Sequence, residues 1–244
     1  MDNRWAIYID IEGFSTLHAN GNNAALWALN RLMLAIYRIG TTAYPQSPDR
    51  LFAHQFGDGF LIVSDFHEKN LDRAALIAVL LMKYITNFGV FAKAAIAEGD
   101  LSDISGCYPD EAINNYHSRE PIMMGEGLMT ISPVMGTALI NAVSINKRSP
   151  KGPLLITSPD YKDRLSSIFI VNEIPEDKLV SLDWVHTECN ELIDIHKKAD
   201  LEYPSSENLE KSIRDYVIKH DKLPSEWITN CSKHLKVENI HNPF

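Results

Sequence analysis

The sequence predicts an α+β fold in which helices flank a mainly antiparallel sheet. Residues 4–11, RWAIYIDI, are β-branched, aromatic and mostly apolar, which is typical of a buried central strand. Two short apolar runs on either side of Gly57 and Asp58 have the pattern of a β-hairpin. Apolar residues at helical spacing in 22–39 and 71–87 predict one helix before the hairpin and one after it.

The remaining part of the sheet is expected from a strand at 90–99 and a short strand at 154–157. Between them, residues 100–132 lose all periodicity, are rich in turn formers and form a longer stretch than ordinary loops do. We interpret this stretch as a functional excursion or an interface element. A helix is expected to open near Pro133 and to end at Ser149.

The chain divides into residues 1–177, expected to form the main domain, and residues 178–244, expected to form a helical C-terminal extension. The extension contains two apolar-periodic segments, 180–201 and 206–220, which predict two helices before a polar tail. The sequence does not indicate whether this extension is an oligomer contact or a lid.

Composition excludes several classes of protein. A formal net charge of −9 argues against a broad surface for nucleic acid or anionic membranes, because such surfaces depend on Lys and Arg. No apolar run approaches the roughly 20 residues that span a bilayer, and the N-terminus lacks a signal-like segment. We therefore expect a cytoplasmic protein without nucleic-acid or membrane partners.

The three cysteines, Cys107, Cys189 and Cys231, are far apart and leave an odd thiol. Their spacing is not that of paired metal ligands, and the histidines form no ligand cluster either. We expect a reducing compartment and no structural zinc.

Two carboxylates carry the chemical hypothesis. Asp10 lies near the end of a buried strand, where a charge costs several kcal/mol unless it is paired or bound to metal, and AIYIDIEGFS contains no Lys or Arg. Asp58 lies at the predicted hairpin tip, where it could be an ordinary turn residue. If the tip lies beside the end of the first strand, the two carboxylates form an oxygen-ligand site for Mg²⁺ or Mn²⁺.

The turn Gly13-Phe14-Ser15 follows Asp10 and offers backbone N–H groups at a helix start, which is an arrangement that binds phosphates. Gly57 and Gly59 would let the backbone approach metal and triphosphate closely. Together these features predict a nucleoside triphosphate held through two metal ions, which suits an in-line displacement at phosphorus.

Several segments resemble a known family when they are taken in order. YIDIEGFS, FGDGF, AKAAIAEGD, and VMGTALINAVSIN before KGPLLIT are similar to the catalytic domain of class III nucleotide cyclases, over about residues 4–160. The sequence most resembles the bacterial pyrimidine cyclases of the Pycsar anti-phage systems, which make cyclic UMP or cyclic CMP.

The resemblance implies roles for particular residues. Asp10 and Asp58 would be the metal carboxylates, and the carbonyl of Ile11 would be a backbone ligand, for two Mn²⁺ or Mg²⁺ ions. Gly13, Phe14 and Ser15 would contact the triphosphate. Head-to-tail homodimers with sites at the interface are implied, as is a separate effector that senses the cyclic pyrimidine.

The sequence departs from the family at the base-reading positions. His54 stands where purine cyclases have a lysine, and Thr137 stands at the later position, which is usually acidic or polar. A neutral histidine has one donor and one acceptor, so His54 could address uracil or cytosine. We expect UTP as substrate, with CTP, or a purine read by altered contacts, as alternatives.

The sequence also departs at the catalytic helix. An ungapped match places Ile140 and Ser144 where the family has a ribose-orienting Asn and a transition-state Arg. Candidates for a replacement cation are Arg119, Lys147 and Arg148, with Lys93 a further possibility. The missing pair also leaves open a degenerate cyclase fold that binds nucleotide as a sensor. The Gly-Gly-Asp/Glu-Glu-Phe signature of diguanylate cyclases is absent.

Overall fold

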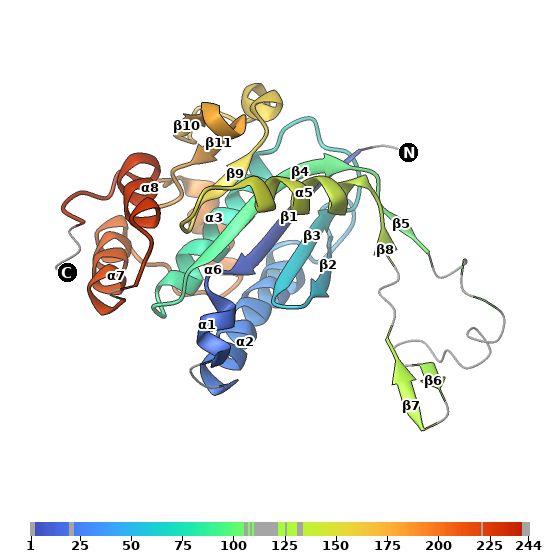
Figure 1. Ribbon diagram of the computed structural model, residues 1–244. Coiled ribbons are helices and arrows are strands. Elements are labelled where there is room, and N and C mark those ends of the chain that lie inside the picture. The colour runs from blue at the N-terminus through green and yellow to red at the C-terminus, as the bar shows by residue number, and fades with distance from the viewer. Residues whose placement is uncertain are drawn as a thin grey trace.

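The computed structural model describes residues 3–19, 22–104, 107, 109, 122–124, 126–130, 134–220 and 222–240. Its main element is a seven-stranded sheet in the order β10-β11-β9-β4-β1-β3-β2 (Figure 1). The β4–β9 pair is parallel and the other neighbouring pairs are antiparallel, so the predicted mainly antiparallel sheet is confirmed. The strands are β1 (Arg4–Ile11), β2 (Leu51–Phe56), β3 (Gly59–Ser64), β4 (Ala92–Gly99), β9 (Leu155–Thr157), β10 (Val171–Ile174) and β11 (Leu179–Leu182).

Helices cover both faces of this sheet. In Figure 1, α5 lies in front of the sheet, α3 and α6 lie behind it, and α7 and α8 lie at the left end. The helices are α1 (Phe14–Ala19), α2 (Asn22–Arg38), α3 (Asp72–Thr86), α5 (Thr137–Arg148), α6 (Asn190–Lys198), α7 (Ser206–Lys219) and α8 (Ser225–Leu235). Short helical turns occupy Ile39–Ala43, Pro159–Arg164 and Pro175–Asp177. The predicted order of elements from the first strand to β4 is confirmed.

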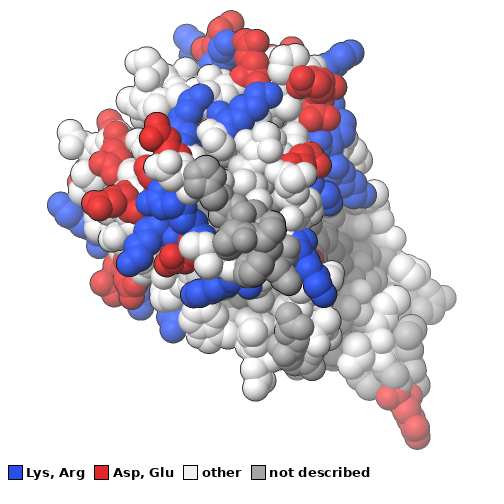
Figure 2. All heavy atoms as spheres, turned by 60° about the vertical axis from the view of Figure 1, so that its left-hand side comes forward, with Lys and Arg blue, Asp and Glu red and all other residues white. Residues whose placement is uncertain are grey.

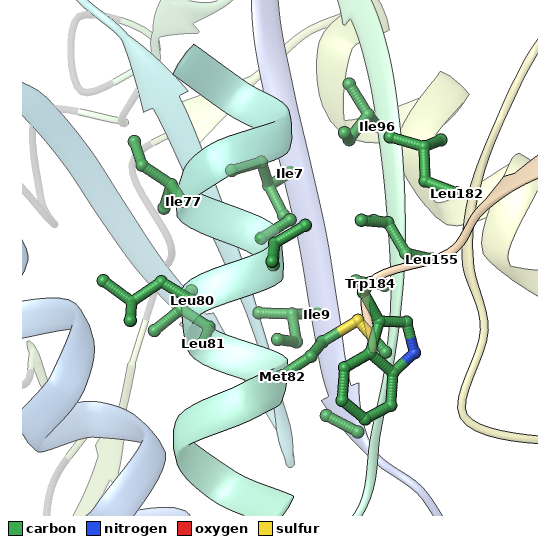
Figure 3. Close-up of a cluster of buried hydrophobic side chains, with 14 of the residues drawn as sticks. Ile7, Ile9, Ile77, Leu80, Leu81, Met82, Ile96, Leu155, Leu182 and Trp184 are labelled. Atoms are coloured by element: carbon green, nitrogen blue, oxygen red, sulfur yellow. The ribbon is translucent and has the colours of Figure 1, made fainter. Parts of the chain in front are cut away.

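The largest part of the core lies between the sheet and α3. Figure 3 shows Ile7 and Ile9 of β1 facing side chains of α3, with Trp184 closing one end of the cluster. Side chains alternate along a strand, so Tyr8 and Asp10 must lie on the opposite face, the face that α5 covers. The alternation of β1 therefore separates a dry apolar face from the face that carries the candidate carboxylates.

The expected helix start near Pro133 needs correction. Pro133 itself lies outside the described residues, and Val134–Met135 forms a short strand, β8, paired with β5 (Ser102–Asp103). The helix begins at Thr137, after Gly136, whose φ of 152° places it in the region that favours glycine. A second small ladder joins β6 (Ile122–Met124) to β7 (Gly127–Met129), well away from the main sheet in Figure 1.

The C-terminal region also differs from expectation. Residues 179–182 form strand β11 rather than the start of a helix, and all four are buried. Short buried apolar runs do not distinguish strand from helix by periodicity, which explains the error. β11 pairs with β10 across the expected boundary at 177/178. Helix α8, which the sequence did not predict, adds Trp227, Cys231 and Leu235 to the main core.

The surface shown in Figure 2 carries basic and acidic side chains interspersed over the end of the molecule where α7 and α8 lie. Within the described ranges, no helix has both the length and the apolar character that crossing a membrane requires.

Candidate functional site

The end of β1 and the tip of the β2–β3 hairpin meet at one corner of the sheet. The register pairs Asp10 with Gly59 of β3 on one side and with Lys93 of β4 on the other. Asp58 directly precedes Gly59 in the hairpin turn, and neighbouring strands lie about 4.8 Å apart. The negative charge of Asp58 is close enough to help raise the pKa of Asp10. The structure thus brings together the two carboxylates that the sequence singled out.

Few groups compensate the negative charge of Asp10. Burial is the main reason why its pKa rises to about 6, and the charges of Asp58 and Glu12 raise it further. Lys93 and a hydrogen bond from Asn146 act in the opposite direction; Asn146 Nδ2 donates to Asp10 Oδ2 over 3.1 Å. The Oδ1 atom of the same Asn146 is buried without a hydrogen-bond partner. An oxygen-rich and under-neutralised group of this kind suits a cation.

Glycine is required on both sides of Asp58. Gly57 has a φ of +64°, which other residues rarely adopt. A Cβ at Gly59 would lie 2.4 Å from the hydroxyl oxygen of Tyr8, so that side chain occupies the space above the glycine. Burial, followed by the charges of Asp10 and Asp58, raises the pKa of Tyr8 to about 12. Tyr8 is therefore a neutral hydroxyl beside both carboxylates.

A cavity of about 660 Å³ lies next to this corner, with Tyr8 on its wall. Its other walls are Phe56 of β2 and one face of α5, made of Leu139, Ile140, Val143, Ser144, Lys147 and Arg148. Most of these side chains are apolar, and Lys147 and Arg148 add positive charge at one end of α5. Such a cavity suits a ligand with a flat apolar part and an anionic part.

The turn after β1 lies beside Tyr216 of helix α7, although Gly13 and Ser15 are exposed. Gly13 has a φ of +71°, and a Cβ there would lie 4.0 Å from the hydroxyl of Tyr216 on α7. Tyr216 belongs to an aromatic cluster with Phe91 and Trp227, with ring centroids 4.7 Å and 5.5 Å from its own. The C-terminal extension therefore contacts the turn that the sequence assigned to phosphate binding.

The other residues of this turn lead from the end of β1 into α1. Ile11 is buried at the end of β1, and α1 begins at Phe14. Ser15 is exposed in the first turn of this short helix, and the carbonyl of Gly13 accepts the N–H of Thr16.

The two expected base-reading residues lie apart from this corner. Thr137 hydrogen-bonds Asp100 just after the end of β4, whereas Lys93, opposite Asp10, lies near its beginning. Along a strand this separation is roughly 20 Å. His54 is half-buried on β2 and pairs with Leu61 rather than with Gly59. Burial lowers its pKa, with Asp103 acting in the opposite direction.

Of the three candidate cations, Lys147 and Arg148 line the cavity, and Arg119 lies outside the described residues.

Sequence reasoning missed Asn146 and Glu12. Asn146 could have been found, because it is a polar residue on the buried face of α5 that includes Ala138, Ala142 and Ile145. Nothing local in the sequence indicated that Glu12 would pair with Lys93 of β4.

The residues present are compatible with magnesium or manganese, although the described residues contain no group of three or more His, Cys, Asp or Glu side chains placed to hold a metal. Mg²⁺ commonly takes one or two protein carboxylates and completes its shell with water and substrate phosphates. Asp10, Asp58 and the Ile11 carbonyl fit that pattern of ligands.

Comparison with known proteins identifies no family. No protein-family model matches the chain, and no curated protein matches its sequence. The chemical interpretation therefore depends on the residues and their geometry.

Proposed function

We propose that this protein is a nucleotide cyclase that converts UTP to 3′,5′-cyclic UMP and pyrophosphate. The observation that carries the proposal is the meeting of Asp10 and Asp58 at one corner of the sheet, beside a cavity with cations at one end. The order and spacing of the motifs around these carboxylates support it, because they resemble those of class III cyclases. CTP is the alternative substrate.

Asp10, Asp58 and the carbonyl of Ile11 would hold two Mn²⁺ or Mg²⁺ ions. When bound, such ions stabilise the attacking and the leaving oxygens of an in-line displacement. Asp10 is suited to this role because Asn146 orients one of its oxygens while its charge stays incompletely compensated.

The reaction joins the ribose 3′ oxygen to the α-phosphorus and breaks the bond from that phosphorus to the oxygen bridging to the β-phosphate. The 3′ proton leaves to solvent, and pyrophosphate is released. Lys93 lies across from Asp10, and Lys147 and Arg148 lie on the cavity, so these three side chains can offset the charge of the triphosphate. The turn Gly13-Phe14-Ser15 would contact the phosphates.

A head-to-tail homodimer is part of the proposal. In one chain, His54 and Thr137 lie away from Asp10, so a second copy would supply the residues that read the base at each site. Two large apolar side chains are well exposed: Ile140 of α5, which lines the cavity, at 62%, and Met135 of β8 at 58%. Their exposure is consistent with contact to a second copy.

One observation favours a second candidate, a cyclase fold that binds nucleotide as a sensor without turnover. Ile140 and Ser144 line the cavity and provide neither the amide nor the guanidinium that the family uses. Lys147 and Arg148 lie one turn beyond Ser144 on the same side of α5, and they are the replacements on which turnover depends.

The resemblance also supports a signalling role for the product. Cyclic UMP would activate a separate effector in anti-phage signalling, as in the Pycsar systems.

The test is product identification by mass spectrometry after incubation with Mn²⁺ and ATP, GTP, CTP or UTP in four separate reactions. Wild-type protein should make a 3′,5′-cyclic pyrimidine, and Asp58→Ala should reduce the rate by about 10³-fold or more, because it removes a metal ligand. Asp163→Ala, which changes an exposed carboxylate in the Pro159–Arg164 turn, is the matched control and should keep the activity. Nucleotide binding without product would favour the sensor, and a cyclic purine would contradict the assignment of His54.

A further inference from the structure

An unexpected ion pair lies beside the candidate metal carboxylates. The register makes Lys93 the direct cross-strand partner of Asp10, so their side chains leave the sheet on the same face. Facing Cβ atoms in such a pair lie about 4.5–5.5 Å apart, and an opposite-charge pair normally forms there. The ammonium of Lys93 lies 4.0 Å from Oε2 of Glu12, and it remains close enough to Asp10 to lower the pKa of that carboxyl. Within the described part of the chain, Asp10 forms no ion pair, and its hydrogen bond comes from Asn146.

Glu12 is held where it can compete for this lysine. Its backbone N–H donates to the carbonyl of Phe91 over 2.8 Å, which continues the β1–β4 ladder beyond Ile11. Its carboxylate faces the loop after α5, where Lys151 and the N–H of Gly152 lie close to it. The side chain is only 20% exposed.

The C-terminal helices fix that loop from the other side. Asn230 of α8 donates to the carbonyl of Lys151 over 2.7 Å, and Glu226 accepts the N–H of Lys151 over 3.4 Å. The backbone of Trp227 packs close to Gly152. Helix α8 therefore orders the segment against which Glu12 rests.

An ammonium paired with Asp10 would compete with a divalent cation for the same oxygens. We propose that Glu12 is a positioning residue that draws Lys93 away from Asp10 and so keeps Asp10 available to metal; this inference rests on the metal site of the proposed function. The same pair keeps Lys93 at the edge of the site, where it can meet a triphosphate.

The test is a double-variant cycle on Mn²⁺ binding, measured from the electron paramagnetic resonance signal of free Mn²⁺. The titration is made with 3′-deoxyuridine triphosphate, which lacks the attacking hydroxyl and so does not turn over. Glu12→Gln should weaken Mn²⁺ binding about tenfold, because Lys93 is then free to pair with Asp10. In the Lys93→Gln background, the same change should have almost no effect.

Three controls separate the possible causes. Asp163→Asn removes one exposed negative charge in the Pro159–Arg164 turn and should leave Mn²⁺ binding unchanged. Glutamine keeps the size of both Glu12 and Lys93 approximately, and circular dichroism checks that every variant is folded. Asp58→Ala should abolish tight Mn²⁺ binding, which shows that the titrated site is the proposed one.

The outcomes distinguish this inference from the proposed function. If Glu12→Gln weakens binding equally with and without Lys93, or not at all, the positioning role is wrong while the metal site stands. If wild-type protein and Asp58→Ala bind Mn²⁺ alike, or neither binds it, the metal site fails and the positioning role fails with it.

Discussion

Two buried or largely buried carboxylates, those of Asp183 and Asp10, differ in the partners that compensate their negative charge. Asp183 is fully buried and accepts a hydrogen bond from Nδ1 of His186 over 2.9 Å and another from the backbone N–H of the same residue. The other ring nitrogen of His186 lies 3.1 Å from Glu210 of α7, and Glu210 also accepts a bond from Arg214. Asp10 has one amide donor and the like charge of Asp58 nearby.

The comparison separates a structural use of a buried charge from a functional one. The Asp183 cluster, made of Asp183, His186, Glu210 and Arg214, gives each charge a partner of opposite sign and ties the segment after β11 to α7. Burial still raises the pKa of Asp183, as it does that of Asp10, but His186 offsets part of this rise. The corner around Asp10 leaves its charge incompletely compensated by Lys93 and Asn146, which costs stability and is useful only if a ligand completes the site. Sites that bind ligands commonly carry such a cost.

The largest effect is expected from breaking the Asp183 cluster. Asp183→Ala should lower the free energy of unfolding by about 2–3 kcal/mol, because it removes the buried acceptor of two hydrogen bonds from the half-buried His186. Urea unfolding followed by circular dichroism measures the change. Glu173→Ala, which removes an exposed carboxylate paired with Lys162, is the control and should change stability by less than about 0.5 kcal/mol. A loss below about 1 kcal/mol for Asp183→Ala would show that the cluster is not structural.

Replacing Asp10 should change the free energy of unfolding in the opposite direction. In metal-free protein at pH 7, Asp10→Asn should raise the free energy of unfolding by about 1–2 kcal/mol, since it removes a carboxylate whose pKa is raised to about 6 in the fold. A raised pKa means that the ionised form is the destabilising one. The gain should therefore be largest above pH 6 and disappear below about pH 4, near the unfolded pKa. A loss of stability at pH 7 would contradict the interpretation of this corner.

A pH dependence of the reverse kind is expected at His186. Burial alone would lower its pKa, but Asp183 and Glu210 outweigh burial and the pKa is raised. The stabilisation is then complete below the unfolded pKa of about 6.5 and is lost as pH rises through the folded pKa. His186→Gln should cost about 1 kcal/mol at pH 6 and less at alkaline pH. Equal costs at every pH would exclude a charged His186.

The smallest change in stability is expected from replacing Lys83. This residue is a third buried charge, in an environment unlike those of Asp183 and Asp10. Its side chain is inaccessible to solvent, and Nζ lies 3.3 Å from the hydroxyl of Tyr203. Burial is the main cause that lowers its pKa to about 8. Lys83→Met should change stability by less than about 1 kcal/mol at pH 7, because the apolar replacement fills similar space without a charge to desolvate. Thermal unfolding would detect a larger loss, which would indicate a stronger partner.

The sequence predicts the centre of the sheet well because its signals are local. Strand β1, the hairpin at Gly57-Asp58 and helix α3 each carry their own periodicity or turn residues, and all three are confirmed. Helix α5 starts later than expected because Val134–Met135 is used in a pairing with β5, which no local pattern reveals. β11 escaped prediction because a short, wholly buried run is ambiguous.

The same distinction between local signals and long-range packing applies to the candidate site. The strand end at Asp10 and the hairpin turn at Asp58 each have a local signal, so their meeting could be stated as a condition, and the pairing of β1 with β3 fulfils it. The contacts of Glu12 with Lys93 and of Gly13 with Tyr216 depend on segments distant in sequence, and packing rather than pattern decides them. In the proposed homodimer, the positions of His54 and Thr137 relative to a nucleotide would depend on a second copy of the chain.

One measurement tests the central claim most directly. Purified protein is incubated with Mn²⁺ and an equimolar mixture of ATP, GTP, CTP and UTP, and the cyclic products are quantified by mass spectrometry. The account predicts that cyclic UMP, or cyclic CMP, is the main product and that Asp58→Ala makes neither. A cyclic purine as the main product, or a wild-type protein that makes no cyclic nucleotide, would contradict it.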